Sequence, residues 1–197
     1  MKLRMIVGMS LLVLSACATP PKPRYYSLSP ASRLPARAAS AIPSYRVAIA
    51  TATVPEVLDR AQIVLRAEPN RYEIADAERW LEPLPREISR AIIEEMAERL
   101  PAARVASDSQ YAGQGADYRV LIDVLRFESV PGKATTLEAA WSIRSRTGAR
   151  LHEAQSLLVE KPSAPGVEPL VAAHAQGLAA LGQEIATAIA ALAQMKR

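Results

Sequence analysis

Side chains that could carry out catalysis are few in this sequence and are poorly placed for it. The two histidines, His152 and His174, lie far apart, and no second thiol or acidic cluster stands at metal-ligand spacing. His152-Glu153 begins a zinc-binding helix motif, but Ser156 stands where the second histidine would be. His174 lies four residues before Leu178, and we interpret it as a histidine at the edge of the core.

Glycine-containing segments that could bind phosphate also depart from the known patterns. Gly113-Gln114-Gly115 has Tyr118 where a dinucleotide-binding fingerprint needs its third glycine. Gly132-Lys133 has Phe127 and Ala134 where a P-loop needs glycine and a serine or threonine. The sequence therefore predicts no enzyme, no metal site and no bound cofactor.

The only cysteine in the chain, Cys17, is placed for a different chemistry. Lys2 and Arg4 come first, followed by an apolar run over residues 6–14, which is the order of a bacterial secretory signal. The run is shorter than the roughly 20 residues that span a bilayer. The segment Leu14-Ser15-Ala16-Cys17 resembles the lipobox of bacterial lipoproteins, in which the signal is cut before the cysteine and the cysteine is acylated.

Acylation of Cys17 would fix the mature chain to a membrane. Each buried methylene contributes about 0.8 kcal/mol, and several acyl chains hold firmly where a single chain binds reversibly. Ala18 stands where aspartate is associated with inner-membrane retention, so the motif favours the periplasmic face of the outer membrane. An ordinary cleavable signal with an incidental cysteine is the alternative. An acylated Cys17 would leave no thiol for a disulfide.

Composition is typical of a globular protein, with 50% hydrophobic residues. Without Lys2 and Arg4, 22 basic residues stand against 20 acidic ones, a net charge of +2. Such a balance lacks the basic signature of a nucleic-acid-binding protein, so we expect no nucleic-acid partner.

Three segments are expected along the chain. They are a lipoprotein signal peptide over residues 1–16, a lipid-anchored, proline-rich tether over 17–44, and one domain over 45–197. Within the tether, Tyr25-Tyr26-Ser27-Leu28 has the composition of an edge strand.

The hydrophobic pattern predicts an α/β (α+β) domain with one mixed, mostly antiparallel sheet and two main helices. The expected strands cover residues 46–51, 62–67, 72–76, 117–130, 135–146 and 150–160. The second and third strands should form a hairpin, and the last three an antiparallel meander. Apolar residues on both sides of strand 117–130 indicate that both of its faces are covered.

Two helices are expected, one from Pro83 to before Pro101 and one over residues 168–195. The polar face of the first should hold Glu87, Arg90, Glu94, Glu95 and Glu98. The second carries an alanine face that would let another surface approach closely, formed by Ala172, Ala179, Ala186, Ala190 and Ala193. The protein's own sheet is the simpler partner for this face, and another subunit is the alternative.

Several motifs in register resemble the ABC-type transport auxiliary lipoprotein family, also called the PqiC or YmbA family. They are the lipobox, Tyr25-Tyr26-Ser27-Leu28, the run from Asp59 to Arg66, Asn70-Arg71-Tyr72, and the run from Arg79 to Leu84. Ala61 departs from the proline that relatives often carry before Gln-Ile-Val. The family-motif residues, with a structural or partner-contact role, are Gln62, Ile63, Val64, Arg66, Trp80, Pro83 and Leu84.

The resemblance implies an outer-membrane lipoprotein that works with an MCE-domain protein, an inner-membrane permease and an ATPase in moving lipids or other hydrophobic molecules between membranes. It would dock the MCE component at the outer membrane and hydrolyse no ATP itself. Relatives have folds like the anticodon-binding and TolB amino-terminal domains, and some form homo-oligomeric rings. The alternative is a free-standing periplasmic lipid-binding module, in which the sheet and the alanine-rich helix enclose an acyl chain.

Among the motif residues, three have alternative roles. Trp80 is expected to be a core aromatic rather than a partner anchor. Gln62 and Arg66 should lie on one face of their strand and take part in a hydrogen bond or salt bridge within the subunit.

Overall fold

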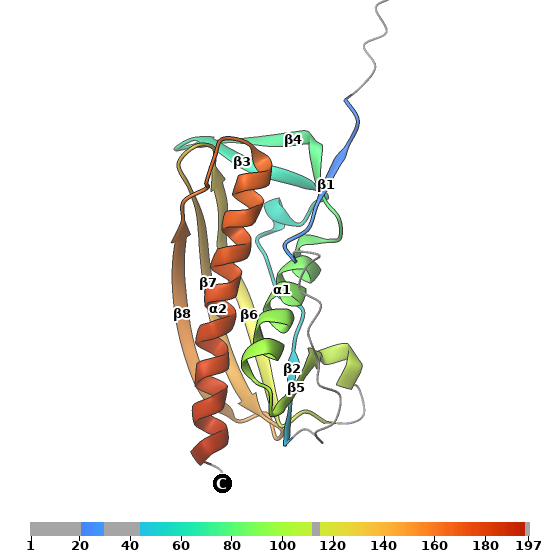
Figure 1. Cartoon of the computed structure of the whole chain (residues 1–197), viewed down its shortest axis with the longest axis vertical. Coiled ribbons are helices and arrows are strands. Elements are labelled where there is room, and N and C mark those ends of the chain that lie inside the picture. The colour runs from blue at the N-terminus through green and yellow to red at the C-terminus, as the bar shows by residue number, and fades with distance from the viewer. Residues whose placement is uncertain (1–20, 30–43, 112–114, 196–197) are drawn as a thin grey trace, which may run out of the picture.

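The computed structural model describes residues 21–29, 44–111 and 115–195. Cys17, the expected signal peptide, most of the expected tether and Gly113-Gln114 lie outside these ranges. The described residues form a mixed α+β fold with two sheets and two main helices (Figure 1). One sheet was expected; the structure has two, because the hairpin pairs with the N-terminal strand instead of joining the main sheet.

The main sheet has five strands in the order β5-β2-β6-β7-β8. Their bounds are β2 Tyr45–Ile49, β5 Ala103–Ser107, β6 Tyr118–Val130, β7 Ala134–Ser145 and β8 Arg150–Glu160. The pairs of β2 with β5 and with β6 are parallel, whereas β6, β7 and β8 form the predicted antiparallel meander. The turns between these three strands contain Gly132 and Gly148, at φ of 69° and 87°, where glycine is favoured.

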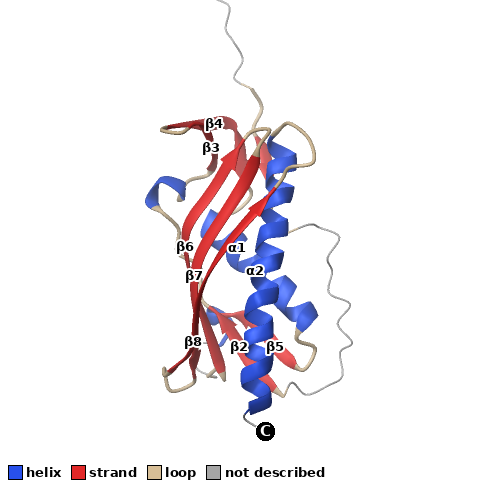
Figure 2. Ribbon diagram, turned by 90° about the vertical axis from the view of Figure 1, so that its left-hand side faces the viewer, coloured by secondary structure: helices blue, strands red, loops and turns tan. Residues whose placement is uncertain are grey.

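The smaller sheet has three strands in the order β1-β4-β3 and lies at one end of the molecule (Figure 2). The predicted hairpin is present as β3, Gln62–Glu68, and β4, Arg71–Trp80, which is longer than expected. The short strand β1, Arg24–Tyr26, pairs in parallel with the end of β4 and forms an edge, as its composition indicated. Two short 3-10 helices, Glu56–Leu58 and Asp108–Tyr111, complete the described elements.

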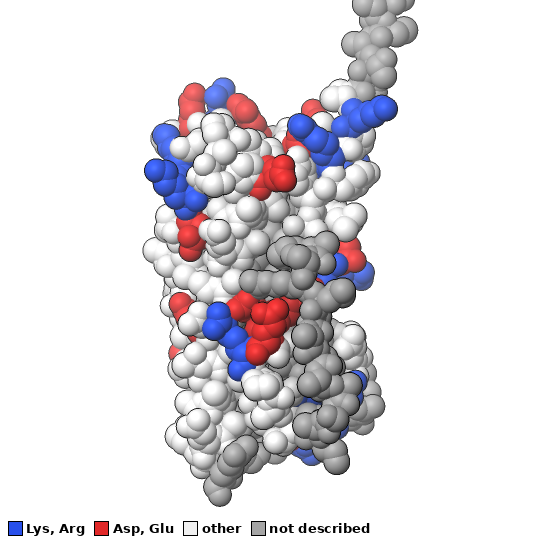
Figure 3. Space-filling view, in the orientation of Figure 1, with Lys and Arg blue, Asp and Glu red and all other residues white. Residues whose placement is uncertain are grey.

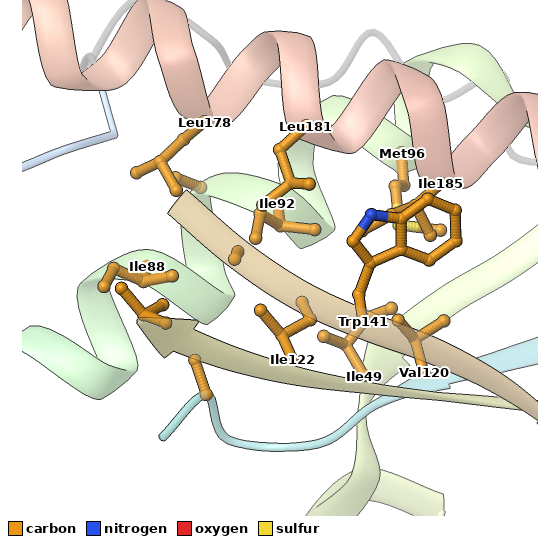
Figure 4. Packing of buried hydrophobic residues seen from close by; sticks show 14 of the residues in the cluster. Ile49, Ile88, Ile92, Met96, Val120, Ile122, Trp141, Leu178, Leu181 and Ile185 are labelled. Carbon is orange, nitrogen blue, oxygen red and sulfur yellow. The ribbon is translucent and has the colours of Figure 1, made fainter. Parts of the chain in front are cut away.

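The two helices, α1 over Leu84–Arg99 and α2 over Val167–Met195, lie on one face of the main sheet (Figures 1 and 2). Between them and the sheet lies a core of fully buried side chains, seen in Figure 4, that includes Ile88, Ile92, Met96, Leu178, Leu181 and Ile185. Ile143 of β7 belongs to the same core. Burying each such side chain contributes about 1.5–3 kcal/mol. By length and composition alone α2 could cross a membrane, but its buried face identifies it as a core helix.

Strand β7 follows the predicted alternation, since Leu137, Ala139, Trp141 and Ile143 are buried and their neighbours are half-buried. The expectation for β6 is wrong. Leu125 faces outward and is 45% exposed, and a register shift between Val124 and Arg126 brings Phe127 to the core. One face of β6 is therefore covered. The bulge explains why buried apolar residues occupy even-numbered positions before it and an odd-numbered position, Phe127, after it.

The expected polar face of α1 is also partly wrong. Glu87 and Glu95 are 0% and 3% exposed, because Ser27 and Leu28, just after β1, cover the first turn of α1 and α2 crosses its last turns. Each carboxylate has an arginine one turn later on the same helix, with Arg90 2.7 Å from Glu87 and Arg99 2.5 Å from Glu95. Paired, hydrogen-bonded carboxylates can be buried where isolated ones cannot.

Two glycines of α2 are expected to respond in opposite ways to alanine. A Cβ at Gly182 would lie 3.0 Å from Cγ of Glu95, a side chain that its ion pair holds in place, whereas a Cβ at Gly177 would meet ordinary contacts of 3.8–3.9 Å. Gly177→Ala should raise the unfolding free energy by about 0.5–1 kcal/mol through helix propensity. Gly182→Ala should lower it by about 1–2 kcal/mol through overpacking. Denaturant titration monitored by tryptophan fluorescence measures both, and a stabilised Gly182→Ala would contradict the close crossing.

Candidate functional site

A groove lies where β1 and the residues after it meet α1 and α2. Its volume is about 490 Å³, within the range of ligand and peptide sites. Apolar and small side chains form most of its lining, among them Leu28, Ala91, Val171, Ala172, Ala175 and Ala179. Two members of the predicted alanine face of α2, Ala172 and Ala179, thus lie in this groove rather than on the sheet.

One wall of the groove is the segment of β1 and the residues after it, and Glu87 holds this wall in place. Its carboxylate accepts hydrogen bonds from the backbone N–H of Leu28 at 2.9 Å and from the hydroxyl of Ser27 at 3.0 Å. Arg90 donates to both Glu87 and Ser27, at 2.7 and 3.0 Å. Arg24 forms an ion pair with Glu78 of β4. The wall is therefore fixed from two sides.

The charged groups that line the groove are acidic. Glu94 of α1 and Glu168 at the start of α2 contribute to the lining, and neither belongs to an ion pair among the described residues. Burial, followed by a hydrogen bond to Glu78, raises the pKa of Tyr26, so its hydroxyl stays protonated. An apolar segment that carries lysine or arginine complements such a groove. On the described face in Figure 3, charges of both signs are scattered and form no extended basic surface.

Most of the motif residues lie in the core. Ile63, Val64, Trp80 and Leu84 are 2%, 9%, 6% and 1% exposed. The Trp80 ring packs edge-to-face against Phe127 with centroids 6.2 Å apart. This burial fits a core role and leaves Trp80 little surface for a partner.

The remaining motif residues lie at the boundary between the two sheets. Arg66 forms an ion pair of 2.8 Å with Glu128 of β6, and the Tyr72 hydroxyl donates to the same carboxylate at 2.9 Å. Gln62 lines a small hollow next to Trp80, and the exposed Pro83 directly precedes α1. The structure thus brings the motif together as a junction between hairpin, main sheet and helix, away from the groove.

Sequence reasoning missed the groove and Glu87. The residues that form the groove come from positions near 25, 91 and 171, and no local pattern links them. Glu87 looked like one of several acidic residues on an exposed helix face. The one available signal was an acidic residue in the first helical turn, a common feature that does not reveal a buried role.

Possible catalytic groups are either buried or isolated. In the ranges that the structure covers, no group of three histidine, cysteine, aspartate or glutamate side chains could hold a metal ion. His174 is 1% exposed, stacks on Phe127 at 3.7 Å between ring centroids, and lies with Nε2 2.8 Å from the Ser129 hydroxyl. Burial lowers the pKa of His174 to about 3. It is a neutral core residue.

The buried His174 should make stability depend on pH. Its pKa is about 3 in the fold and about 6.5 unfolded, so between these values the unfolded chain binds the extra proton. The unfolding free energy should therefore fall by about 1.4 kcal/mol per pH unit as the pH drops below 6.5. Denaturant titrations of the parent chain and His174→Gln between pH 4 and 7 measure this term. Equal pH slopes in the two proteins would contradict it.

A comparison with protein families decides where the chain belongs. Residues 26–186 match the model of the ABC-type transport auxiliary lipoprotein component. The chain belongs to this family. The family is one of lipoproteins that accompany ABC-type transport systems, so the chain is an auxiliary component of such a system. Members of this family are typically not enzymes. Comparison with curated proteins gives no match.

Solved structures support the fold of this auxiliary lipoprotein. A crystal structure of an uncharacterized protein aligns with a TM-score of 0.71 and 21% identity, covering 86% of this chain and 99% of that one. The protein XCC0632 from Xanthomonas campestris, of family DUF330, aligns with a TM-score of 0.63 and 18% identity, covering 78% and 89%. The PelC dodecamer from Paraburkholderia phytofirmans, at 0.42 and 13%, covering 68% and 81%, is too remote to carry an inference.

Proposed function

We propose that this auxiliary lipoprotein is anchored by an acylated Cys17 at the periplasmic face of the outer membrane and docks an MCE-domain protein there. An inner-membrane permease and an ATPase would complete the system, which moves lipids or other hydrophobic molecules between the membranes. The protein itself is a binding subunit and catalyses no reaction. The family resemblance, in which some relatives form rings, is the support for including a homo-oligomeric ring in this proposal.

The observation that carries this proposal is the family match over residues 26–186, which assigns the folded part to transport auxiliary lipoproteins. The lipobox at Leu14-Ser15-Ala16-Cys17 supplies the means of anchoring. A folded head of this kind on a lipid anchor presents a rigid surface at a fixed place on a membrane. Such a surface suits a docking subunit.

The groove beside β1 is the proposed contact surface for the partner. Its apolar lining and the carboxylates of Glu94 and Glu168 suit an amphipathic segment that carries lysine or arginine on one side. Small side chains such as Ala175 let a partner backbone approach closely. The partner segment would gain apolar burial from the lining and charge pairing from the two glutamates.

Crosslinking in native membranes followed by mass spectrometry tests the proposal. The intact chain should yield crosslinks to an MCE-domain protein, with crosslinked sites near the groove, and Cys17→Ala should weaken or lose them. Recovery of self-crosslinks alone, with no transport component, would count against the proposed function.

The alternative of a lipid-binding module has less support from the fold. No space is left for an acyl chain between α2 and the main sheet, because Leu178 and Leu181 of α2 fill this layer and are fully buried (Figure 4), as is Leu137 of β7 at 2% exposure. The groove beside β1 has a size and an apolar lining that would suit such a ligand. Native mass spectrometry that finds the protein with a stoichiometric bound lipid would favour this alternative, and bare protein would dismiss it.

A further inference from the structure

The pairing of β1 with β4 shortens the connection between the fold and the anchored residue. Arg24, the first residue of β1, comes seven positions after Cys17. An extended chain reaches at most about 3.3–3.6 Å per residue, so this connection spans at most about 25 Å. A tether reaching to residue 44 would have allowed several times that distance. The inference below rests on the acylation of Cys17 that the proposed function assumes.

The end of the molecule beside this connection includes residues 24–29 and 56–81, here called the anchor end, and the turn between β6 and β7 and the loop before α2 lie at the same end (Figure 1). It contains the three-stranded sheet and the short helix before it (Figures 1 and 2). The C-terminus of α2 and the turn between β7 and β8 lie at the opposite end of the long axis (Figure 1). A connection this short holds the anchor end nearer to the lipid than the opposite end.

The anchor end also concentrates exposed hydrophobic side chains. Half of the large hydrophobic residues that are exposed in the described ranges belong to it, although it is a small part of the fold. These are Tyr25 at 59%, Val57 at 55%, Tyr72 at 50%, Ile74 at 47% and Leu81 at 59% exposure. Exposed apolar residues gathered in one region mark an interaction surface, and tyrosine suits the boundary between water and lipid.

The charges of the anchor end indicate what kind of contact it could make with a membrane. It holds five arginines and six acidic residues. A surface that is nearly neutral gains little from anionic head groups, in contrast to a polybasic patch. The attraction of the anchor end itself to lipid would therefore come from its apolar and aromatic side chains.

We propose that the anchor end lies directly against the lipid surface of the anchoring leaflet. Ile74 and Leu81 enter the boundary between head groups and acyl chains, and the C-terminal end of α2 points away from the membrane. The protein is thus held at two places, by its acylated cysteine and by this apolar surface. This fixes the orientation of the groove relative to the membrane, with the β1 wall closest to the lipid.

Site-specific fluorescence on the full-length, acylated chain tests the orientation. Ile74→Cys and Leu81→Cys report on the anchor end, and Leu151→Cys and Met195→Cys, exposed by 40% and 76%, are matched controls at the opposite end. Each protein is labelled with an environment-sensitive dye and reconstituted into vesicles that contain nitroxide lipids. We expect loss of most of the fluorescence at positions 74 and 81, retention at 151 and 195, and no change at high salt.

Two results would overturn the inference. One is equal or stronger quenching at positions 151 and 195; the other is no quenching at any position while the protein floats with the vesicles. Failure of the anchor itself is seen separately. The parent chain would then take up dye at Cys17 and would not float with the vesicles, which contradicts the proposed function as well as the orientation.

Discussion

Replacing Glu87 with alanine is expected to release β1 from the fold and to lower the unfolding free energy by about 3 kcal/mol. The substitution removes the acceptor for the backbone N–H of Leu28, a residue that is 1% exposed, and leaves Arg90 without its nearest carboxylate. Breaking a buried, hydrogen-bonded ion pair from one side costs about 3–5 kcal/mol, and the partial exposure of Arg90 places the effect at the lower limit.

Glu98→Ala is the matched control, because Glu98 is exposed on the same helix. Denaturant titration should separate the two variants by most of the expected 3 kcal/mol. Limited proteolysis should cut the Glu87→Ala chain after Arg24 under conditions that spare the control. In vesicles, the released strand would lengthen the tether, and quenching at position 81 should decrease. Equal stability of the two variants would contradict the role given to Glu87.

Replacing Cys17 with serine is expected to move the whole protein from the membrane to the soluble periplasmic fraction. The reason is the loss of several acyl chains, each methylene of which contributes about 0.8 kcal/mol to membrane binding. The apolar contact of the anchor end alone would be reversible. Fractionation and mass spectrometry of the N-terminal peptide measure the change. Ala18→Ser is the control, because it changes the neighbouring residue and retains the Cys17 thiol that is acylated. Firm membrane association of Cys17→Ser would contradict lipid anchoring.

The parts of the fold that sequence could predict are those with a long, regular pattern. The alternation in β7 and the leucine and isoleucine stripe of α2 extend over many residues. They are long enough to show whether each segment is a strand or a helix and which of its side chains face the core. Strand β5 was missed, because its five residues, Ala103–Ser107, alternate too briefly to be distinguished from a loop. The bulge at Leu125 reverses which residues beyond it face the core, and no residue in this part of the sequence indicates that a bulge is present.

The candidate site was less predictable than the fold. The motif near Gln62 and Trp80 is recognisable in sequence, and in the structure it forms a junction in the core. The groove depends on contacts between distant segments, such as that of Leu28 with Glu87. Glu87 and Glu95 are buried because other elements cover α1. The pattern of residues within α1 carries no information about those elements.

Co-purification from solubilised membranes tests the central claim most directly. Three chains are compared: the parent, Ala175→Trp, which fills the groove, and Ala191→Trp, on an exposed part of the same helix. The account predicts that an MCE-domain protein accompanies the parent and Ala191→Trp and is lost with Ala175→Trp. Absence of any transport component from the parent preparation, or equal recovery with all three chains, would contradict it.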